Sequence, residues 1–185
     1  MIWIKADRFA IKGNAFFRKV NIRIVLTFLL INLTSCSVNY SFTGASISPD
    51  VKTVSIEHFQ NLAPLVNPTL NTYLTEELKN KFVSQTRLNV VPNFGDLTFS
   101  GEIRNYQVQP VAPQANEIAA LNRLTISVRV KFENSKDPTQ NFDKTFSHFE
   151  DFDSQQQLNQ VEQGLVETIV AKLVEDIFNN AVANW

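Results

Sequence analysis

Ten residues in the second half of the chain, Leu124-Thr125-Ile126-Ser127-Val128-Arg129-Val130-Lys131-Phe132-Glu133, alternate without a break between apolar and polar side chains. Successive side chains of a β-strand point to opposite faces of its sheet. The alternation therefore predicts a strand with one buried face and one face in water. Such a strand is typical of an antiparallel sheet that is covered by helices on one side.

Three other segments are predicted to be strands, and a fourth to be a short extended piece. Residues 97–104 place their apolar side chains on one face and their polar side chains on the other. Residues 142–152 are less regular, because Phe149 breaks the parity of the other aromatic residues, so a bulge or a sheet edge is expected there. Residues 51–59 are rich in β-branched residues, and the extended piece covers residues 88–92.

Two amphipathic helices are predicted from apolar residues that recur every three or four positions. The first covers residues 68–85, with Asn67 as its cap and Pro68 at its first position. The second follows Ser154 and Gln157, which match a capping box. Its apolar residues form two adjacent ridges: Leu158, Val161, Leu165, Ile169, Leu173 and Ile177 in one, and Val166, Val170 and Val174 in the other.

The order of strand, helix, strands and helix predicts an α+β protein. We expect a two-layer sandwich, in which two helices pack on one face of a mostly antiparallel sheet of about four strands. The chain after residue 35 is long enough for one domain with a substantial core. That single domain is expected to cover residues 51–185.

The N-terminal region predicts a bacterial lipoprotein signal. Cys36, the only cysteine of the chain, follows Leu33-Thr34-Ser35 at the end of a short apolar segment that is preceded by basic residues. This pattern indicates a signal peptide over residues 1–35, removed by cleavage before Cys36, whose sulfur is then acylated. The apolar segment is shorter than the roughly 20 residues that a membrane span requires. The alternative is an N-terminal anchor helix with an incidental cysteine.

Acylation would have two consequences for the remaining chain. Two or more acyl chains on Cys36 would hold the protein essentially permanently at a membrane, and no free thiol would remain for a disulfide, a metal or a nucleophile. Residues 36–50 would then form a short acylated tether before the first strand. Residues 37–40 contain no acidic residue, which under the sorting rules of bacterial lipoproteins favours the outer membrane and a periplasm-facing domain.

The charge balance argues against nucleic acid as a partner. Residues 1–35 contain six of the 17 basic residues and one of the 18 acidic residues, so the chain from Cys36 onward has a net charge near −6. Binding to nucleic acid depends on basic surfaces that neutralise phosphates.

The chain shows no pattern of catalytic residues. His58 and His148 are its only histidines, and no third ligand at a suitable spacing completes a zinc site. No serine lies in a Gly-x-Ser-x-Gly turn, and no glycine-rich phosphate loop is present. The sequence therefore predicts a protein that is not an enzyme and has neither a cofactor nor a metal site.

Basic residues gather on the polar face of the predicted strands. Such a stripe is a candidate contact for phosphates or carboxylates of a partner. The alternative is cross-strand pairing with Glu102, Glu133 and Asp143. The candidate contacts are Arg104, Arg123, Arg129 and Lys131, and Lys144 is expected beside them.

Residues 107–120 are predicted to form a long connection between two strands. The segment contains two prolines, several apolar residues and a single charged residue, Glu117. Two interpretations stay open: a segment that docks into a partner, and an ordinary surface loop.

Several of these segments together resemble the LptE family of lipopolysaccharide-assembly lipoproteins, and its Bacteroidetes branch in particular. They are the lipid-attachment signal at Cys36, the strand and helix that follow it, Ala-Ala-Leu-Asn-Arg-Leu-Thr-Ile-Ser-Val-Arg-Val at residues 119–130, and Asp-Ile-Phe-Asn-Asn-Ala-Val-Ala-Asn-Trp at residues 176–185. The resemblance extends over essentially all of the chain after Cys36. The C-terminal segment is its most specific part.

The resemblance implies an outer-membrane lipoprotein that plugs the LptD β-barrel, which inserts lipopolysaccharide into the outer leaflet. It also implies a small sandwich of two helices on a sheet, and basic residues near the sheet that engage lipopolysaccharide phosphates. The resemblance assigns these roles to no particular residue here, so Arg104, Arg123, Arg129 and Lys131 are candidate contacts for lipopolysaccharide or for the barrel on their charge pattern alone. The alternative functions are a scaffold of another periplasmic envelope complex, and a module that binds a lipid or small ligand between helices and sheet.

Overall fold

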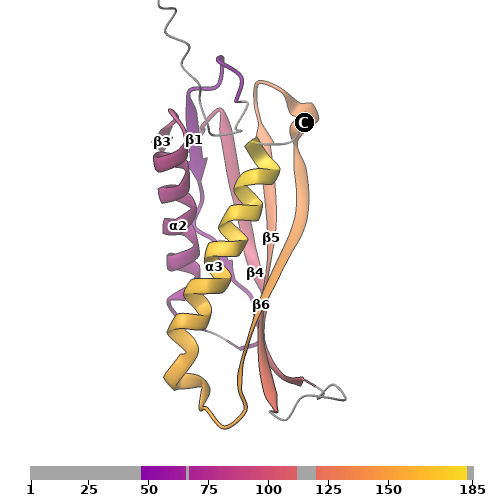
Figure 1. Cartoon of the computed structure of the whole chain (residues 1–185). Coiled ribbons are helices and arrows are strands. Elements are labelled where there is room, and N and C mark those ends of the chain that lie inside the picture. The colour runs from indigo at the N-terminus through magenta and orange to yellow at the C-terminus, as the bar shows by residue number, and fades with distance from the viewer. Residues whose placement is uncertain (1–46, 66, 112–119, 183–185) are drawn as a thin grey trace, which may run out of the picture. The chain divides into compact units, whose positions relative to one another are not determined.

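The computed structural model describes residues 47–65, 67–111 and 120–182. These residues form two layers, a twisted sheet and two helices that cover one of its faces (Figure 1). The predicted signal peptide, Cys36 and residues 112–119 lie outside the described residues.

The sheet has six strands in the described residues and is mixed, not mostly antiparallel. The order of the strands is β3-β1-β4-β5-β6, and β2 pairs with β4 beyond the end of β1. The first three strands make only parallel pairs, whereas β4, β5 and β6 pair antiparallel. The prediction of about four mostly antiparallel strands is wrong in this detail: residues 51–59 contain β1 as expected, but β2 and β3, with two and three residues, are too short to show a sequence period. The strands are β1 (Thr53–Ile56), β2 (Gln60–Asn61), β3 (Asn89–Val91), β4 (Leu97–Val111), β5 (Leu121–Asn134) and β6 (Phe142–Asp153).

The predicted central strand is confirmed as β5. Its apolar side chains are almost completely buried under the helices, while the polar residues between them face the other side of the sheet. The antiparallel pairing with both β4 and β6 explains the uninterrupted alternation, because each face of β5 has one environment along its whole length. The buried residues are Leu124, Ile126, Val128, Val130 and Phe132.

A β-bulge at Arg104 explains why β4 is longer than predicted. The register shifts between Ile103 and Asn105, so Arg104 has no partner on β5. The extra residue reverses the parity of the strand, and Tyr106 instead of Asn105 is buried on the helix side. Residues 107–111, which the sequence assigned to a loop, therefore continue β4 and pair with residues 121–125.

Both predicted helices are present, and they cover the same face of the sheet (Figure 1). They are α2 (Leu70–Gln85) and α3 (Leu158–Val182). The predicted start of α2 at Pro68 with Asn67 as its cap is wrong, because the helix begins at Leu70 and its N-cap is Thr69; the Asn67 side chain accepts the backbone N–H of Thr69 at 3.1 Å before the helix. The predicted capping box at Ser154 is wrong, because Ser154 donates its backbone N–H to Ala120 and α3 starts only at Leu158.

Aromatic rings connect the two layers through the core. Neighbouring ring centroids lie 4.8–5.1 Å apart along a chain that starts on α3, crosses α2 and the central strands, and ends on β6. Aromatic pairs at such distances contribute beyond the area that they bury. The chain of rings is Phe178, Phe82, Phe99, Phe132 and Phe142.

The strand β6 forms one edge of the sheet, as one of the two alternatives for residues 142–152 predicted. Its helix-facing polar residues contact α3 at positions four residues apart, which form one stripe on that helix. Lys144 belongs to this set, so the expectation that it joins the basic residues on the polar face is wrong. The contacts are Lys144 with Asn180 at 3.2 Å, His148 with Asp176 at 2.6 Å, and Glu150 with Lys172.

A close backbone crossing links β3 to β4. These strands lie on opposite sides of β1, so residues 92–96 pass over β1 at Ser55. Connections between parallel strands usually need a dozen or more residues. Gly95 permits the short path, because a Cβ at this position would lie 2.5 Å from the backbone nitrogen of Ser55 and 2.6 Å from the carbonyl oxygen of Leu97.

Candidate functional site

The open face of the sheet, opposite the helices, carries the basic residues singled out from the sequence. The alternation of β5 places Arg123, Arg129 and Lys131 on this face, and the bulge exposes Arg104 at its border. We call this surface, formed by the polar residues of β4, β5 and β6, the polar face. The structure thus brings the four predicted residues onto one side of the sheet.

Carboxylates pair with every one of these four basic residues. The guanidinium of Arg129 donates to both carboxylate oxygens of Asp143, at 2.8 and 2.7 Å, and its third nitrogen lies 3.6 Å from Glu102. These contacts raise the pKa of Arg129, and the hydrogen bonds from Arg129 lower the pKa of Asp143. The other pairs are Arg104 with Glu102 at 2.9 Å, Lys131 with Glu133 at 2.7 Å, and Arg123 with Asp151 at 2.7 and 2.9 Å.

The polar face therefore alternates positive and negative charge. The cross-strand partners Glu102 and Asp143 lie where the pairing alternative expected them, and Asp151 is a further partner that the sequence did not single out. The guanidinium of Arg123 also stacks on the exposed ring of Phe149 at 3.6 Å from the ring centroid. A face of this kind suits recognition of a complementary polar surface better than attraction of anions alone.

A cavity of about 280 Å³ opens on the polar face where β1 ends and β2 begins. Its walls carry His58 and Glu57 from the β1–β2 connection, together with Glu102, Arg129 and Lys131. The imidazole of His58 lies 3.0 Å from the side-chain amide of Asn71 on α2. The cavity thus offers both donors and acceptors to a polar group.

A second concavity, of about 460 Å³, lies between the first turns of the two helices. Glu162 lines this concavity, and its carboxylate accepts the hydroxyl of buried Tyr106 and the side-chain amide of Asn67, the latter at 2.9 Å. Burial, together with Glu162, raises the pKa of Tyr106. Sequence reasoning missed this cluster, since its members come from β4, α3 and the segment before α2.

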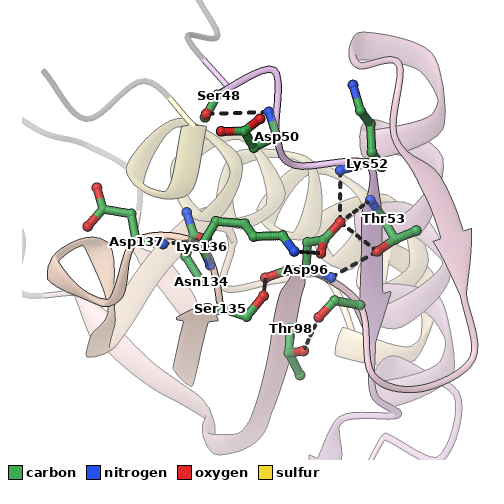
Figure 2. Close-up of polar contacts among 11 residues, drawn as sticks. Ser48, Asp50, Lys52, Thr53, Asp96, Thr98, Asn134, Ser135, Lys136 and Asp137 are labelled. Carbon is green, nitrogen blue, oxygen red and sulfur yellow. Dashed lines mark hydrogen bonds and ion pairs between the residues drawn. The ribbon is translucent and has the colours of Figure 1, made fainter.

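At the end of the domain where β1 begins, Asp96 contacts both the start of β1 and the turn between β5 and β6 (Figure 2). Its carboxylate accepts the backbone N–H groups of Lys52 and Thr53, at 2.9 and 3.1 Å, and lies 3.0 Å from the ammonium of Lys136. Its backbone carbonyl accepts the N–H of Ser135 at 2.9 Å. The hydrogen bonds that the carboxylate accepts from Lys52, Lys136 and Thr53 hold the pKa of Asp96 well below its usual range.

The histidines lie apart from each other, His58 beside α2 and His148 beside Asp176 on α3. Within residues 47–65, 67–111 and 120–182, no three His, Cys, Asp or Glu side chains are placed to share a metal ion. In the same part of the chain, no helix combines the length and apolar character needed to cross a membrane.

Comparison with solved structures finds similarity to several bacterial proteins. A neuraminyllactose-binding hemagglutinin homolog from Helicobacter pylori is 9% identical, with a TM-score of 0.50 over 70% of this chain and 82% of that chain. A hypothetical protein from Chlamydia trachomatis is 10% identical, with a TM-score of 0.48 over 72% and 99% of the two chains. A minor lipoprotein from Acinetobacter baumannii is 16% identical, with a TM-score of 0.44 over 70% and 91%.

No individual curated protein matches the sequence. The model of the LptE family, described as lipopolysaccharide-assembly, matches residues 51–181. This match covers all six described strands, α2, and α3 up to residue 181. The chain therefore belongs to the LptE family of lipopolysaccharide-assembly proteins.

Proposed function

We propose that this protein is an outer-membrane lipoprotein that occupies the lumen of an LptD-type β-barrel and assists the folding of that barrel. Membership in the LptE family supports a role in lipopolysaccharide assembly. In this proposal, cleavage removes residues 1–35, acylated Cys36 anchors the chain in the periplasmic leaflet, and residues 36–50 tether a single domain over residues 51–185. The protein supplies contacts and no catalysis.

The observation that carries the proposal is the separation between the two ends of the domain. The chain enters the fold just before β1, at the same end as the turn between β5 and β6 (Figure 1). The connection between β4 and β5 lies at the opposite end, beyond Val111 and Leu121. The 25 residues of α3 span about 37 Å between these ends. An anchored domain of this length can reach from the membrane surface into a barrel lumen.

The surfaces of the domain suit such a site. Lumens of transmembrane barrels are polar, and the polar face presents alternating charges along β4, β5 and β6. We assign the polar face and the residues around the β4–β5 connection to contacts with the lumen wall.

The candidate residues Arg104, Arg123, Arg129 and Lys131 are proposed to contact the barrel, not to bind lipopolysaccharide phosphates. Each already pairs with a carboxylate, so a phosphate would have to displace Glu102, Asp151, Asp143 or Glu133. A protein partner can instead bind the intact pairs. The alternative for the same residues is direct binding of lipopolysaccharide.

The test is to shorten the β4–β5 connection without disturbing the hairpin. Replacing residues 112–119 by Gly-Ser-Gly leaves Ala120, whose carbonyl accepts the N–H of Ser154 at 3.0 Å, in a four-residue loop. We expect an unchanged melting temperature and a several-fold lower recovery of folded barrel with the tagged, acylated protein from solubilised outer membrane.

A matched control replaces Asp137-Pro138-Thr139, in the turn at the opposite end, by three Gly and Ser residues and leaves Lys136 beside Asp96. This variant is expected to retain full barrel recovery. Equal recovery with the shortened β4–β5 connection would contradict the role of that connection. Recovery of a different envelope complex by the unaltered protein would contradict the proposed function itself.

A further inference from the structure

The side chain of Phe94 is fully exposed, and its backbone has a φ of 57°. It has the highest exposure among the large apolar residues that the structure describes. The left-handed region is rarely populated by bulky residues, and an exposed aromatic ring gains nothing from burial. A residue that combines both disadvantages points to a function for the ring at this place.

The segment that carries Phe94 is firmly attached to the sheet. The next residue, Gly95, lies against the backbone of Ser55, and Asp96 is held by the backbone N–H groups of Lys52 and Thr53. These contacts fix the base of the loop while the ring projects into solvent. The loop is therefore already ordered before any partner binds, and binding carries no free-energy cost for ordering it.

Phe94 also lies at the end of the domain where the chain enters the fold. The partners of Asp96, Lys52 and Thr53, follow directly on Val51, which is buried in the core, and Ile47 packs against that core. Cys36 precedes Ile47 by eleven residues. A chain of this length spans at most about 40 Å, so the membrane that holds an acylated Cys36 stays within reach of this end.

We infer that Phe94 contacts the phospholipid surface in which Cys36 is anchored, with its ring at the level of the headgroups. The inference rests on the lipid anchor of the proposed function. Phenylalanine is among the residues that bury apolar surface at this depth. The headgroup layer yields around a single projecting ring, whereas a protein partner would have to offer a shaped pocket.

The charges at this end indicate how the contact should behave. Three basic and three acidic residues balance each other at this end, so it has no strong attraction to anionic lipids. The contact is expected to be insensitive to salt. One ring adds little to the membrane-binding free energy of several acyl chains. Its effect is to orient the domain on the membrane. The charged residues are Lys52, Arg87, Lys136, Asp50, Asp96 and Asp137.

The test uses the full, acylated chain, in which Cys36 is blocked and an introduced cysteine is the only free thiol. Phe94→Cys carries an environment-sensitive fluorophore, and Leu65→Cys is the control, an exposed apolar position near the opposite end. The vesicles contain phosphatidylethanolamine and phosphatidylglycerol, with or without a lipid that bears a nitroxide at its headgroup. We expect several-fold stronger quenching at position 94 than at position 65, at low and high salt alike.

Three results would overturn the inference in distinguishable ways. Flotation of the protein with vesicles without quenching at position 94 would refute the contact and leave the lipid anchor intact. Loss of flotation would refute the anchor, and the inference with it. Shielding of position 94 from a water-soluble quencher only when the barrel is present would assign the ring to a protein surface.

Discussion

Asp96 and Thr53 hold each other by two reciprocal hydrogen bonds. The hydroxyl of Thr53 donates to the carboxylate of Asp96 at 3.0 Å and accepts the backbone N–H of Asp96 at 2.9 Å (Figure 2). The two residues are 43 positions apart in the sequence. Their contact closes the crossing of residues 92–96 over β1, so the charge of one carboxylate supports a backbone junction.

Replacing the Asp96 carboxylate by an uncharged amide should make the stability of the fold less dependent on pH. The folded state lowers the pKa of Asp96 below its ordinary value of 3.8. The carboxylate therefore stabilises the fold above that value, and its contribution is lost as the pH falls further. We expect Asp96→Asn to lower the melting temperature at neutral pH, by a margin that narrows towards about pH 3.

The control for Asp96→Asn is Asp50→Asn, whose carboxylate accepts no hydrogen bond from the described residues. Thermal unfolding followed by circular dichroism at several pH values measures both variants. A margin for Asp96→Asn that stays constant over the whole pH range would contradict the role of its charge.

A methyl group at Gly95 should weaken the crossing over β1. Its Cβ would lie within 3 Å of three backbone atoms, so Gly95→Ala is expected to cost about 1–3 kcal/mol in the free energy of unfolding. Gly164 on α3 is the matched position, because a Cβ there meets nothing within 4 Å. Gly164→Ala should stabilise the protein by up to about 1 kcal/mol. Urea unfolding measures both, and similar values for the two variants would contradict the crossing as described.

Removing the hydroxyl of Tyr106 should destabilise the junction between β4 and α3. Tyr106→Phe leaves Glu162 without its buried donor, at an expected cost of about 1.5 kcal/mol. The raised pKa of Tyr106 means that the wild type loses this contribution as the pH rises above 10.0, the ordinary value. The difference between the proteins should therefore shrink in alkali. The control is Tyr73→Phe, whose side chain lines the concavity beside Glu162. It is expected to change the free energy of unfolding by less than about 0.5 kcal/mol.

The strained backbone at Phe94 should be relieved by a residue that tolerates the left-handed region. Asparagine adopts positive φ more readily than phenylalanine. Phe94→Asn is therefore expected to raise the melting temperature slightly, although it removes an aromatic ring. Differential scanning calorimetry of the variant beside wild type decides this. A clear decrease would mean that the ring stabilises the fold, and would remove the reason to assign it an external partner.

Exchanging the members of one ion pair tests the polar face as a contact surface. The double variant Arg129→Asp with Asp143→Arg keeps a pair and reverses the two charges. Because exposed ion pairs contribute only about 0–1 kcal/mol, the stability should change little. Barrel recovery should fall several-fold if the face docks on a complementary surface. Lys172→Glu with Glu150→Lys, a pair on the helix side of the sheet, is the control.

The elements that the sequence predicted well are those with a long internal period. The ten-residue alternation gave β5 with the correct buried face, and the ridges of apolar residues gave α2 and α3. The parallel strands β1 and β3 have four and three residues, too few for a period to appear. The bulge at Arg104 interrupts the period of β4, so its last five residues resembled a loop.

The side on which Lys144 lies and the contact of Tyr106 with Glu162 were not predicted from the sequence, for another reason. Lys144 contacts Asn180, and Tyr106 contacts Glu162, across 36 and 56 positions of the chain. Such contacts depend on strand register and on where the helices cross the sheet. Neither is encoded within one element.

Local periodicity in the chain was enough to establish two helices, the buried face of the central strand and the α+β class, because each follows from the direction of side chains along a single segment. The resemblance to the LptE family was also visible in the sequence. The sheet order, the passage of residues 92–96 over β1 and the choice between free basic residues and paired ones were settled only by tertiary structure. These features require segments distant in the sequence to meet, and their energies exist only once the whole domain has folded.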